Sequence, residues 1–336
     1  MDINSKSIIK NSNITVKFFY ENTRDRFGLK LISEEVGFER EILDQNLHRP
    51  GLALAGFVEL FSSKRVQLFG NTEMRFIEQL DDNKKLHSLE RLFKFDIPCL
   101  VISNGNSPTK EMLHLSEKYK IPIFMTDAPT TKTIYLLSDF LDDQFAPRLS
   151  MHGSFVDVYG VGMLFVGKSG VGKSEVALDL VERGHRLVAD DVVIITKKGE
   201  GILMGAGTDL VKHFMEVRGI GIIDVRSMFG VRAIRFQKRL EVVIDLEIWD
   251  MDTEYTRTGL DDSTQDIMGI KIPYVKLPIV PGKNITVISE IIALNYLLKH
   301  YGYDAPKVFR DKLSAKIKEK NRTTKRTIDY FEHDFE

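Results

Sequence analysis

The sequence predicts an α/β protein with an N-terminal α/β domain over residues 1–145 and a C-terminal phosphate-loop (P-loop) domain over residues 146–336. Three observations predict this fold. Short apolar runs alternate with helical patterns in the first half, which is typical of parallel strands covered by helices. A polar connection ends that pattern at Pro147. The second half contains the phosphate-binding pattern G-x-x-x-x-G-K-[ST] after a strand-like run.

The first half contains apolar runs at residues 66–69, 99–102 and 122–125, which we interpret as strands. Helical patterns occupy residues 72–80 and the segments that follow Pro108 and Pro129. The Asn-Gly-Asn segment at residues 104–106 follows a strand but does not form a convincing phosphate loop. We therefore expect a structural or assembly domain here, with a second active site as the alternative.

The composition indicates a soluble globular protein, because 43% of its 336 residues are hydrophobic and 28% are charged. A net charge of −1 gives no reason to expect nucleic acid or an anionic membrane as a partner. No apolar stretch is long enough to span a membrane, and the first residues lack a signal-peptide pattern. The single cysteine, Cys99, fits a reducing cytoplasm and is expected in the core.

The boundary between the two predicted domains falls in residues 142–147, because a helix must end before Pro147. Beyond it, residues 155–159 and 161–166 flank Gly160 and predict a β-hairpin. The phosphate loop therefore follows a hairpin, whereas in common nucleoside triphosphatases it follows a lone parallel strand.

The phosphate loop carries the clearest chemical signal in the chain. Its glycines let the backbone turn tightly, so that successive N–H groups can point at phosphate oxygens. Lys173 is expected to reach the β- and γ-phosphates, and the Ser174 hydroxyl to ligate Mg²⁺. Residues 175–183 predict a helix that ends at Gly184 and adds its positive end to the anion site. The loop consists of Gly167, Lys168, Ser169, Gly170, Val171, Gly172, Lys173 and Ser174.

Two adjacent carboxylates, Asp190 and Asp191, follow a short predicted strand. Neighbours in a strand point to opposite faces, so we expect one to face the nucleotide and the other the metal shell. Such residues near a phosphate loop hold Mg²⁺ or act as catalytic base, although a solvated turn is the alternative. Glu216 is a further hard oxygen ligand suited to Mg²⁺, but it could equally form a surface ion pair with Arg218.

Two more residues are candidates for catalysis. His152 lies just before the hairpin and could act as an acid or a base; a packed or solvated histidine is the alternative. Arg257 could stabilise charge on a transferred phosphoryl group, although it has the sequence context of a surface arginine.

Taken together, these segments resemble the HPr kinase/phosphorylase family. The resemblance is strong over residues 145–300 and weaker in the first half, which nevertheless has the right length. The motifs follow the family's order and approximate spacing: Met151-His152-Gly153, residues 167–175, residues 183–191, Glu-Val-Arg-Gly-Ile-Gly at 216–221, Arg-Thr-Gly-Leu at 257–260 and Pro-Gly-Lys-Asn at 281–284.

The resemblance implies a bifunctional bacterial enzyme that regulates carbon metabolism. Such enzymes phosphorylate one serine of HPr, a carrier protein of the sugar phosphotransferase system, with ATP or pyrophosphate as donor. They also remove that phosphate by phosphorolysis, in which inorganic phosphate attacks and pyrophosphate is released. The resemblance further implies dependence on Mg²⁺, a homohexamer, and a C-terminal domain similar to the nucleotide-binding core of phosphoenolpyruvate carboxykinase.

Carried over residue by residue, the resemblance implies that Asp191 accepts the serine proton in the kinase direction. The same carboxyl returns a proton to the serine oxygen in phosphorolysis, as microscopic reversibility allows. The resemblance assigns the phosphoryl site to Lys173, His152 and Arg257, and the Mg²⁺ ion to Ser174 and Glu216.

One segment departs from the family. The loop required for dephosphorylation commonly reads Val-Arg-Pro-Gly-Arg-Asn, whereas Val280 and Lys283 occupy the two arginine positions here. Lysine keeps the charge but loses the two-pronged guanidinium, and valine loses both. We therefore expect the kinase reaction to be better preserved than phosphorolysis.

Two other functions remain open from the sequence. A P-loop kinase or carboxykinase acting on a small metabolite would use the same loop and carboxylates. A non-catalytic nucleotide sensor would bind ATP without turnover and would use the first half to bind a partner.

Overall fold

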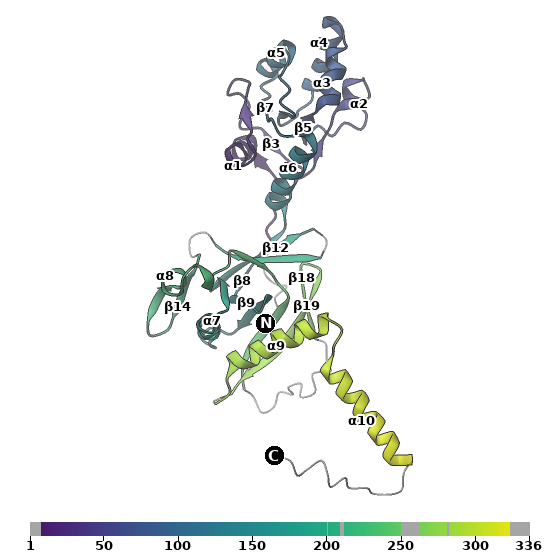
Figure 1. Cartoon of the computed structure of the whole chain (residues 1–336). Coiled ribbons are helices and arrows are strands. Elements are labelled where there is room, and N and C mark those ends of the chain that lie inside the picture. Colours follow the sequence, from purple (N-terminus) through teal and green to yellow (C-terminus); the bar gives the residue numbers. More distant parts are fainter. Residues whose placement is uncertain (1–7, 200, 209–211, 250–262, 281, 323–336) are drawn as a thin grey trace. The chain divides into compact units, whose positions relative to one another are not determined.

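The computed structural model describes residues 8–199, 201–208, 212–249, 263–280 and 282–322. The chain divides into two compact units: Ile9–Arg148 forms one, and the second contains the described chain from Leu149 onward (Figure 1). No helix in the described ranges is both long and apolar enough to cross a bilayer.

The N-terminal unit is built on a five-stranded sheet of order β2-β7-β6-β5-β4. Strands β4 to β7 run parallel, and β2 is antiparallel at one edge. The three strands predicted in this half are present as β5 (Val66–Phe69), β6 (Leu100–Ile102) and β7 (Ile123–Met125). The other strands are β1 (Ile14–Thr15), β2 (Lys30–Leu31), β3 (Glu41–Ile42) and β4 (Leu47–His48).

Helices cover both faces of this sheet, because its strands are apolar on both sides. Phe69, Leu100 and Ile102 pack against α2 to α5, and Cys99 lies in the core on the opposite face with α1 and α6. The helix predicted from Pro108 begins instead at Lys110, because the Thr109 side chain caps it by accepting a hydrogen bond from Met112 N. The helices are α1 (Val16–Phe27), α2 (Gly51–Leu54), α3 (Asn71–Glu78), α4 (Asp82–Phe93), α5 (Lys110–Tyr119) and α6 (Thr130–Phe145).

The C-terminal unit contains a six-stranded sheet of order β11-β9-β10-β17-β19-β18. The predicted hairpin is confirmed, because β9 (Ser154–Val158) pairs antiparallel with β10 (Val161–Gly167). Tyr159 and Gly160 turn it with φ values of 51° and 86°, the backbone that a tight two-residue hairpin requires. The remaining strands of this sheet are β11 (Arg186–Ala189), β17 (Val242–Ile248), β18 (Thr264–Ile267) and β19 (Ile270–Ile279).

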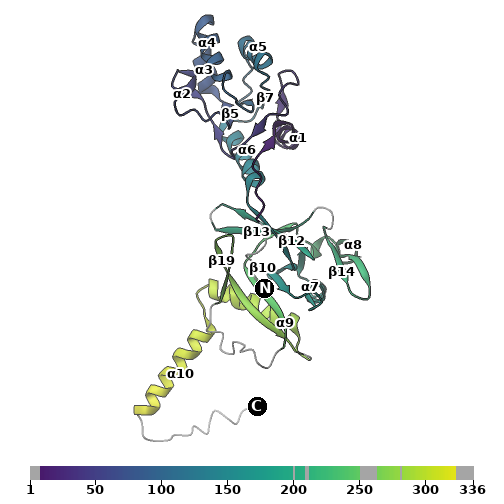
Figure 2. The ribbon, with the colours of Figure 1, turned by 180° about the vertical axis from the view of Figure 1, so that it is seen from behind.

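A second sheet and a small hairpin complete the strands of this unit. The second sheet has the order β16-β13-β12-β8, and the hairpin pairs β14 with β15. The hairpin lies beside α8 in both ribbon views (Figure 2). These strands are β8 (Arg148–His152), β12 (Val192–Lys198), β13 (Ile202–Gly207), β14 (Phe214–Val217), β15 (Gly221–Asp224) and β16 (Gln237–Arg239).

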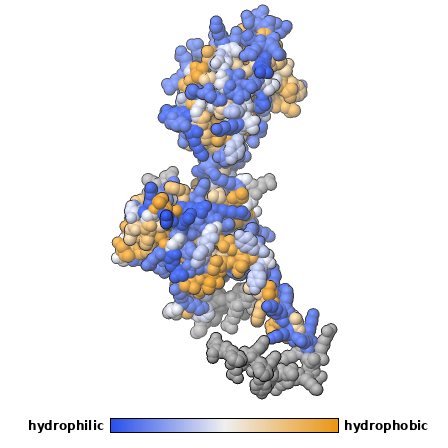
Figure 3. All heavy atoms as spheres, viewed as in Figure 1, coloured by the Kyte–Doolittle hydropathy of each residue, from blue (hydrophilic) through white to orange (hydrophobic). Residues whose placement is uncertain are grey.

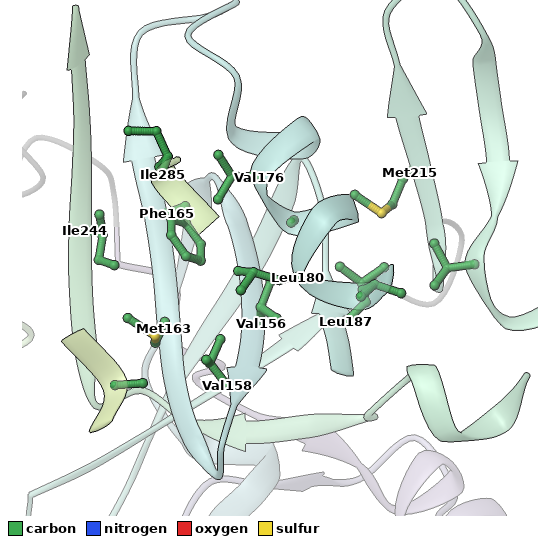
Figure 4. Close-up of a cluster of buried hydrophobic side chains, with 14 of the residues drawn as sticks. Val156, Val158, Met163, Phe165, Val176, Leu180, Leu187, Met215, Ile244 and Ile285 are labelled. Carbon is green, nitrogen blue, oxygen red and sulfur yellow. The ribbon is translucent and has the colours of Figure 1, made fainter. Parts of the chain in front are cut away.

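The helix after the phosphate loop, α7 (Lys173–Glu182), forms as the sequence predicts. Its buried face consists of Val176, Ala177, Leu180 and Val181, which pack on the sheet beside Phe165 (Figure 4). Gly184 follows the end of the helix with a φ of 97° and donates its N–H to Val181 O, while the next N–H reaches Leu180 O. This pair of hydrogen bonds is a Schellman motif, which glycine favours at this position.

The six-stranded sheet is buried on both faces. On one face, side chains of β9, β10 and β17 pack against α7 and α9 (Ile285–His300). On the other face, Leu164 and Val166 pack against the second sheet. This double burial fixes the end of β10, and with it the phosphate loop. The remaining helices are α8 (Val225–Phe229), the short 3₁₀ turn Val231–Ala233 and α10 (Ala305–Arg322).

Candidate active site

A pocket lies above the phosphate loop, at the edge where β10 and β11 end. It joins the loop and the start of α7 to the residues after β11 and to the β14 hairpin. Its lining brings together Lys173, Ser174, Asp191 and Glu216 with three further residues of the predicted phosphate loop, Ser169, Gly170 and Gly172. The full lining is Ser154, Ser169, Gly170, Gly172, Lys173, Ser174, Glu175, Asp190, Asp191, Glu216 and Arg218.

The phosphate loop has the backbone of an anion cradle. Gly167, Gly170 and Gly172 have φ values of 141°, 80° and 102°, which side chains with a Cβ adopt only with strain. A Cβ on Gly167 would also lie 2.4 Å from Leu246 O, so this position requires glycine for space as well. The Lys173 ammonium donates to the carbonyls of Gly167 and Lys168 at 3.3 and 3.1 Å, and so lies folded over the loop.

Asp190 is buried and holds the start of α7. Its carboxylate accepts hydrogen bonds from Ser154 Oγ at 2.5 Å and from Ser174 Oγ at 2.9 Å. Burial raises the pKa of Asp190, and the hydrogen bonds from Ser154 and Ser174 oppose that shift. The carboxyl therefore connects β9 and the phosphate loop at the position where the loop serine would meet a metal ion.

Asp191 is exposed, with 75% of its side-chain surface accessible. Its backbone is in the left-handed region at a φ of 62°, and its carbonyl accepts the N–H of Gly153 at 3.1 Å. The expectation from strand alternation does not apply, because β11 ends at Ala189 and both aspartates line the same pocket. The two carboxylates still differ in environment, one buried and one exposed.

His152 lies beside the exposed carboxylate. Its Nδ1 is 3.8 Å from Asp191 Oδ1, and both side chains are mostly accessible to solvent. At that distance the two groups form an ion pair only when the histidine is protonated, and such an exposed pair contributes little to stability. Its position at the end of β8 therefore places a second titratable side chain next to Asp191.

The β14–β15 hairpin supplies Glu216 and Arg218. The Arg218 guanidinium packs on the phosphate loop, because a Cβ added to Gly170 would lie 2.6 Å from its Nη1. The sequence predicts Arg218 only as an ion-pair partner of Glu216 and gives no role to Ser154. No sequence pattern near either residue predicts that it lies beside the phosphate loop, since the tertiary fold brings each of them there.

The oxygen donors of the pocket fit Mg²⁺. Within the described residues, no three His, Cys, Asp or Glu side chains converge closely enough to hold a metal by themselves. Mg²⁺ is usually bound by one or two carboxylates, with waters and substrate phosphates completing its shell. The Ser174 hydroxyl with the carboxylates of Asp190 and Glu216 matches that requirement. Arg257 lies outside the described residues.

The comparisons with known proteins agree along the whole chain. The HPr serine kinase N-terminus family matches residues 14–141, and the HPr serine kinase C-terminal domain family matches residues 143–313. HPr kinase/phosphorylase from Chloroherpeton thalassium is 52% identical over 100% of both chains. The protein of the same name from Prosthecochloris aestuarii is 50% identical over 94% of both.

A solved structure is also similar, that of the Hpr(Ser) kinase/phosphatase from Coxiella burnetii. It is 33% identical, covers 48% of this chain and 97% of its own, and superposes with a TM-score of 0.43. The family matches on both halves and the identity along the full length lead to one conclusion: the chain belongs to the HPr serine kinase family.

Proposed function

We propose that this protein is a kinase and phosphorylase acting on a serine of the phosphocarrier protein HPr, with ATP or pyrophosphate as donor. The observation that carries the proposal is the pocket that Lys173 and Ser174 line together with the exposed residue Asp191. A phosphate cradle beside an accessible carboxylate is the arrangement that phosphoryl transfer to a hydroxyl requires. Membership of the HPr serine kinase family supports HPr as the protein whose serine hydroxyl accepts the phosphoryl group.

In the kinase direction, Asp191 accepts the serine proton as the serine oxygen attacks the γ-phosphorus. The bond to the bridging oxygen breaks, and ADP leaves. In phosphorolysis an oxygen of inorganic phosphate attacks the phosphoserine phosphorus and the bond from that phosphorus to the serine oxygen breaks. Asp191 gives a proton to the departing serine oxygen, and pyrophosphate is released. Lys173 and Arg257 are proposed to balance charge on the transferred group, with His152 beside the attacking oxygen.

Bound Mg²⁺ would neutralise phosphate charge and orient the donor. Ser174 and Glu216 are the residues proposed to hold it, and Asp190 supports Ser174 from behind. Asp190 is 5% exposed, so we propose that it positions the serine and orders metal-bound water and leaves proton transfer to Asp191.

A protein substrate is favoured over a small metabolite by the surface next to the pocket. Apolar side chains gather on the α8 and β14 edge of the C-terminal unit (Figure 3). A contiguous apolar surface of this kind is typical of a contact with another protein. The hairpin that supplies Glu216 and Arg218 to the pocket carries part of it. The exposed side chains are Ile220, Ile222, Met228, Phe229 and Val231.

We also propose the domain roles, the assembly and the location that the resemblance implies. Residues 1–145 would form a structural or assembly domain, and residues 146–336 a catalytic domain similar to the phosphoenolpyruvate carboxykinase core. The assembly would be a cytoplasmic homohexamer. Exposed apolar side chains on α9 and α10, such as Leu294, Leu298 and Phe309, support self-association. Sedimentation velocity of the full chain tests the hexamer.

The function is tested by transfer of ³²P from ATP. Wild-type protein with Mg²⁺ is expected to label HPr, and Asp191→Asn to lose most of that labelling while still binding ATP. A general base contributes about 10²- to 10⁴-fold to such a reaction, which sets the size of the expected loss. Label in a small metabolite but not in HPr would favour the alternative kinase or carboxykinase, and ATP binding without any turnover would favour a sensor.

A further inference from the structure

A second pocket lies against the other side of the phosphate loop. Gly172 and Glu175 line both pockets, so the two pockets share the first turn of α7 as a wall. The opposite wall is formed by the end of β19 and the start of α9. Its described lining is Val171, Gly172, Glu175, Val176, Asp179, Ile279, Gly282, Lys283, Asn284, Ile285 and Thr286.

The sheet order determines which end of a nucleotide points to this second pocket. Strands β11, β10, β17 and β19 run in the same direction, so their carboxyl ends meet at one edge of the sheet. Ligands of open α/β sheets bind at that edge. Asp190 and Asp191 follow β11 on one side of β10, whereas the second pocket follows β17 and β19 on the other. A triphosphate whose reacting end faces the aspartates therefore directs its nucleoside toward the second pocket.

Trp249 stands beside this pocket, one residue after β17. Its backbone N–H donates to Ile279 O at 3.2 Å, and the Lys283 ammonium lies 5.8 Å from the centre of its ring. Trp249 is 43% exposed, so part of its large aromatic side chain is accessible to solvent. An aromatic face is what a nucleobase stacks on.

The lining also suits a ribose and a base edge. Val171, Val176 and Ile279 provide apolar contact, while polar side chains provide hydrogen-bond partners. The Asp179 carboxylate faces α9 and accepts a hydrogen bond from Thr286 Oγ1 at 3.2 Å. A carboxylate can accept several hydrogen bonds, so Asp179 retains capacity for a sugar hydroxyl.

We propose that this second pocket, with the indole of Trp249 at its edge, binds the nucleoside part of the phosphoryl donor. The inference rests on the proposed nucleotide-dependent function and adds the site that distinguishes ATP from pyrophosphate. ATP occupies both pockets, whereas pyrophosphate occupies only the phosphate loop. The nucleoside pocket therefore contributes to the affinity for ATP and not to the affinity for pyrophosphate.

The test compares ATP with pyrophosphate in two variants at the same position. Binding of each ligand to the full chain with Mg²⁺ is measured by calorimetry for wild type, Trp249→Leu and Trp249→Phe. Trp249→Leu is expected to weaken ATP about tenfold, the effect of losing one base–aromatic stack. Pyrophosphate should bind as in wild type, and Trp249→Phe, which keeps a flat ring, should bind ATP nearly normally.

Three results would overturn the inference. They are equal weakening of ATP and pyrophosphate, unchanged ATP binding in Trp249→Leu, or a rise in the KM for HPr alone, which would assign the pocket to the protein substrate. If Trp249→Leu does not fold, photolabelling of wild type with 8-azido-ATP decides the question: label within residues 279–286 or on Trp249 supports the site, and label elsewhere contradicts it. The calorimetric and photolabelling measurements do not need phosphate transfer, so a failure of the proposed function would appear separately, as HPr that stays unmodified.

Discussion

The Ser174 hydroxyl of the phosphate loop donates a hydrogen bond to the buried carboxylate of Asp190 at 2.9 Å. A carboxylate in this position can orient the serine and the water molecules bound to Mg²⁺ without touching the serine hydroxyl of HPr. Asp190→Asn keeps the shape and removes the charge. We expect the Mg²⁺ concentration for half-maximal kinase activity to rise about tenfold, as is typical when a supporting partner of a metal ligand is lost.

The matched control is Ser154→Ala, which removes the other hydroxyl bound to the same carboxylate and leaves its charge in place. It should shift the Mg²⁺ requirement much less. An unchanged Mg²⁺ dependence in Asp190→Asn would show that Asp190 has no part in the metal site.

Lys173→Ala should abolish both phosphorylation and phosphorolysis and leave the fold intact. The ammonium contacts only loop carbonyls in the described structure, at 3.1 and 3.3 Å, so the folded state depends little on it. A cation beside the transferred phosphoryl group can contribute about 10³-fold or more in rate. Phosphotransfer assays and the far-ultraviolet circular dichroism of the variant check the two halves of this prediction, and full activity in it would refute the assigned phosphate site.

Two alanine variants, Gly170→Ala and Gly184→Ala, should separate the effect of backbone strain on stability from an effect on pyrophosphate binding. Both glycines have positive φ values, 80° and 97°, so alanine should lower the free energy of unfolding by about 1 kcal/mol or more at either position. Only at Gly170 would the new methyl group meet Arg218, whereas the space around Gly184 is open. We expect weaker pyrophosphate binding in Gly170→Ala alone, measured by calorimetry; equal binding in both variants would contradict the packing of Arg218 on the loop.

Glu290 on α9 should make stability depend on pH. The carboxylate is buried and accepts two hydrogen bonds from Arg183, at 2.9 and 2.6 Å, which lower its pKa to about 2. Because the folded state favours the charged form, this contribution is present above the unfolded pKa of about 4.3 and is lost as the pH falls toward 2.

Glu290→Gln should therefore lower the free energy of unfolding at pH 7 by about 2 kcal/mol, because the charged hydrogen bonds to the half-exposed Arg183 are lost. The difference from wild type should shrink at pH 3, as measured by urea unfolding at both pH values. The control is Glu182→Gln on the exposed face of α7, for which the expected change is below about 0.5 kcal/mol. A Glu290→Gln effect that is equally large at pH 3 would exclude this carboxylate as the source of the pH dependence.

Phosphorolysis should be limited by the loop before α9. Val280 and Lys283 replace two arginines of the family's pattern, and the Lys283 N–H is bonded to Val280 O at 3.1 Å, so both belong to one tight turn. Restoring both arginines is expected to raise pyrophosphate release from serine-phosphorylated HPr with phosphate and Mg²⁺, and to leave the kinase rate nearly unchanged. Equal release by wild type and by the double variant would show that the substitutions are harmless.

The sequence was sufficient wherever a feature depends on neighbouring residues. The hairpin at Gly160, the helix after the phosphate loop and the strands β5 to β7 follow from short-range patterns and are present. Asp190 and Asp191 could also be placed near the loop, because a strand end and a loop at one sheet edge must meet.

What the sequence could not predict depends on contacts between distant segments. Arg183 and Glu290 are 107 positions apart, and Ser154 and Asp190 are 36 apart. No periodicity connects such pairs, so their partners emerge only when the sheet and its two covering helices assemble. Arg218 reaches Gly170 for the same reason, from a hairpin outside both main sheets.

The central claim is that this pocket transfers phosphate to a serine of a carrier protein. The most direct measurement is mass spectrometry of purified HPr after incubation with this protein, Mg²⁺ and ATP. We expect one added phosphate, located on a single serine of HPr, and no added phosphate with Lys173→Ala. Unmodified HPr in the presence of a wild-type enzyme that binds ATP would contradict it.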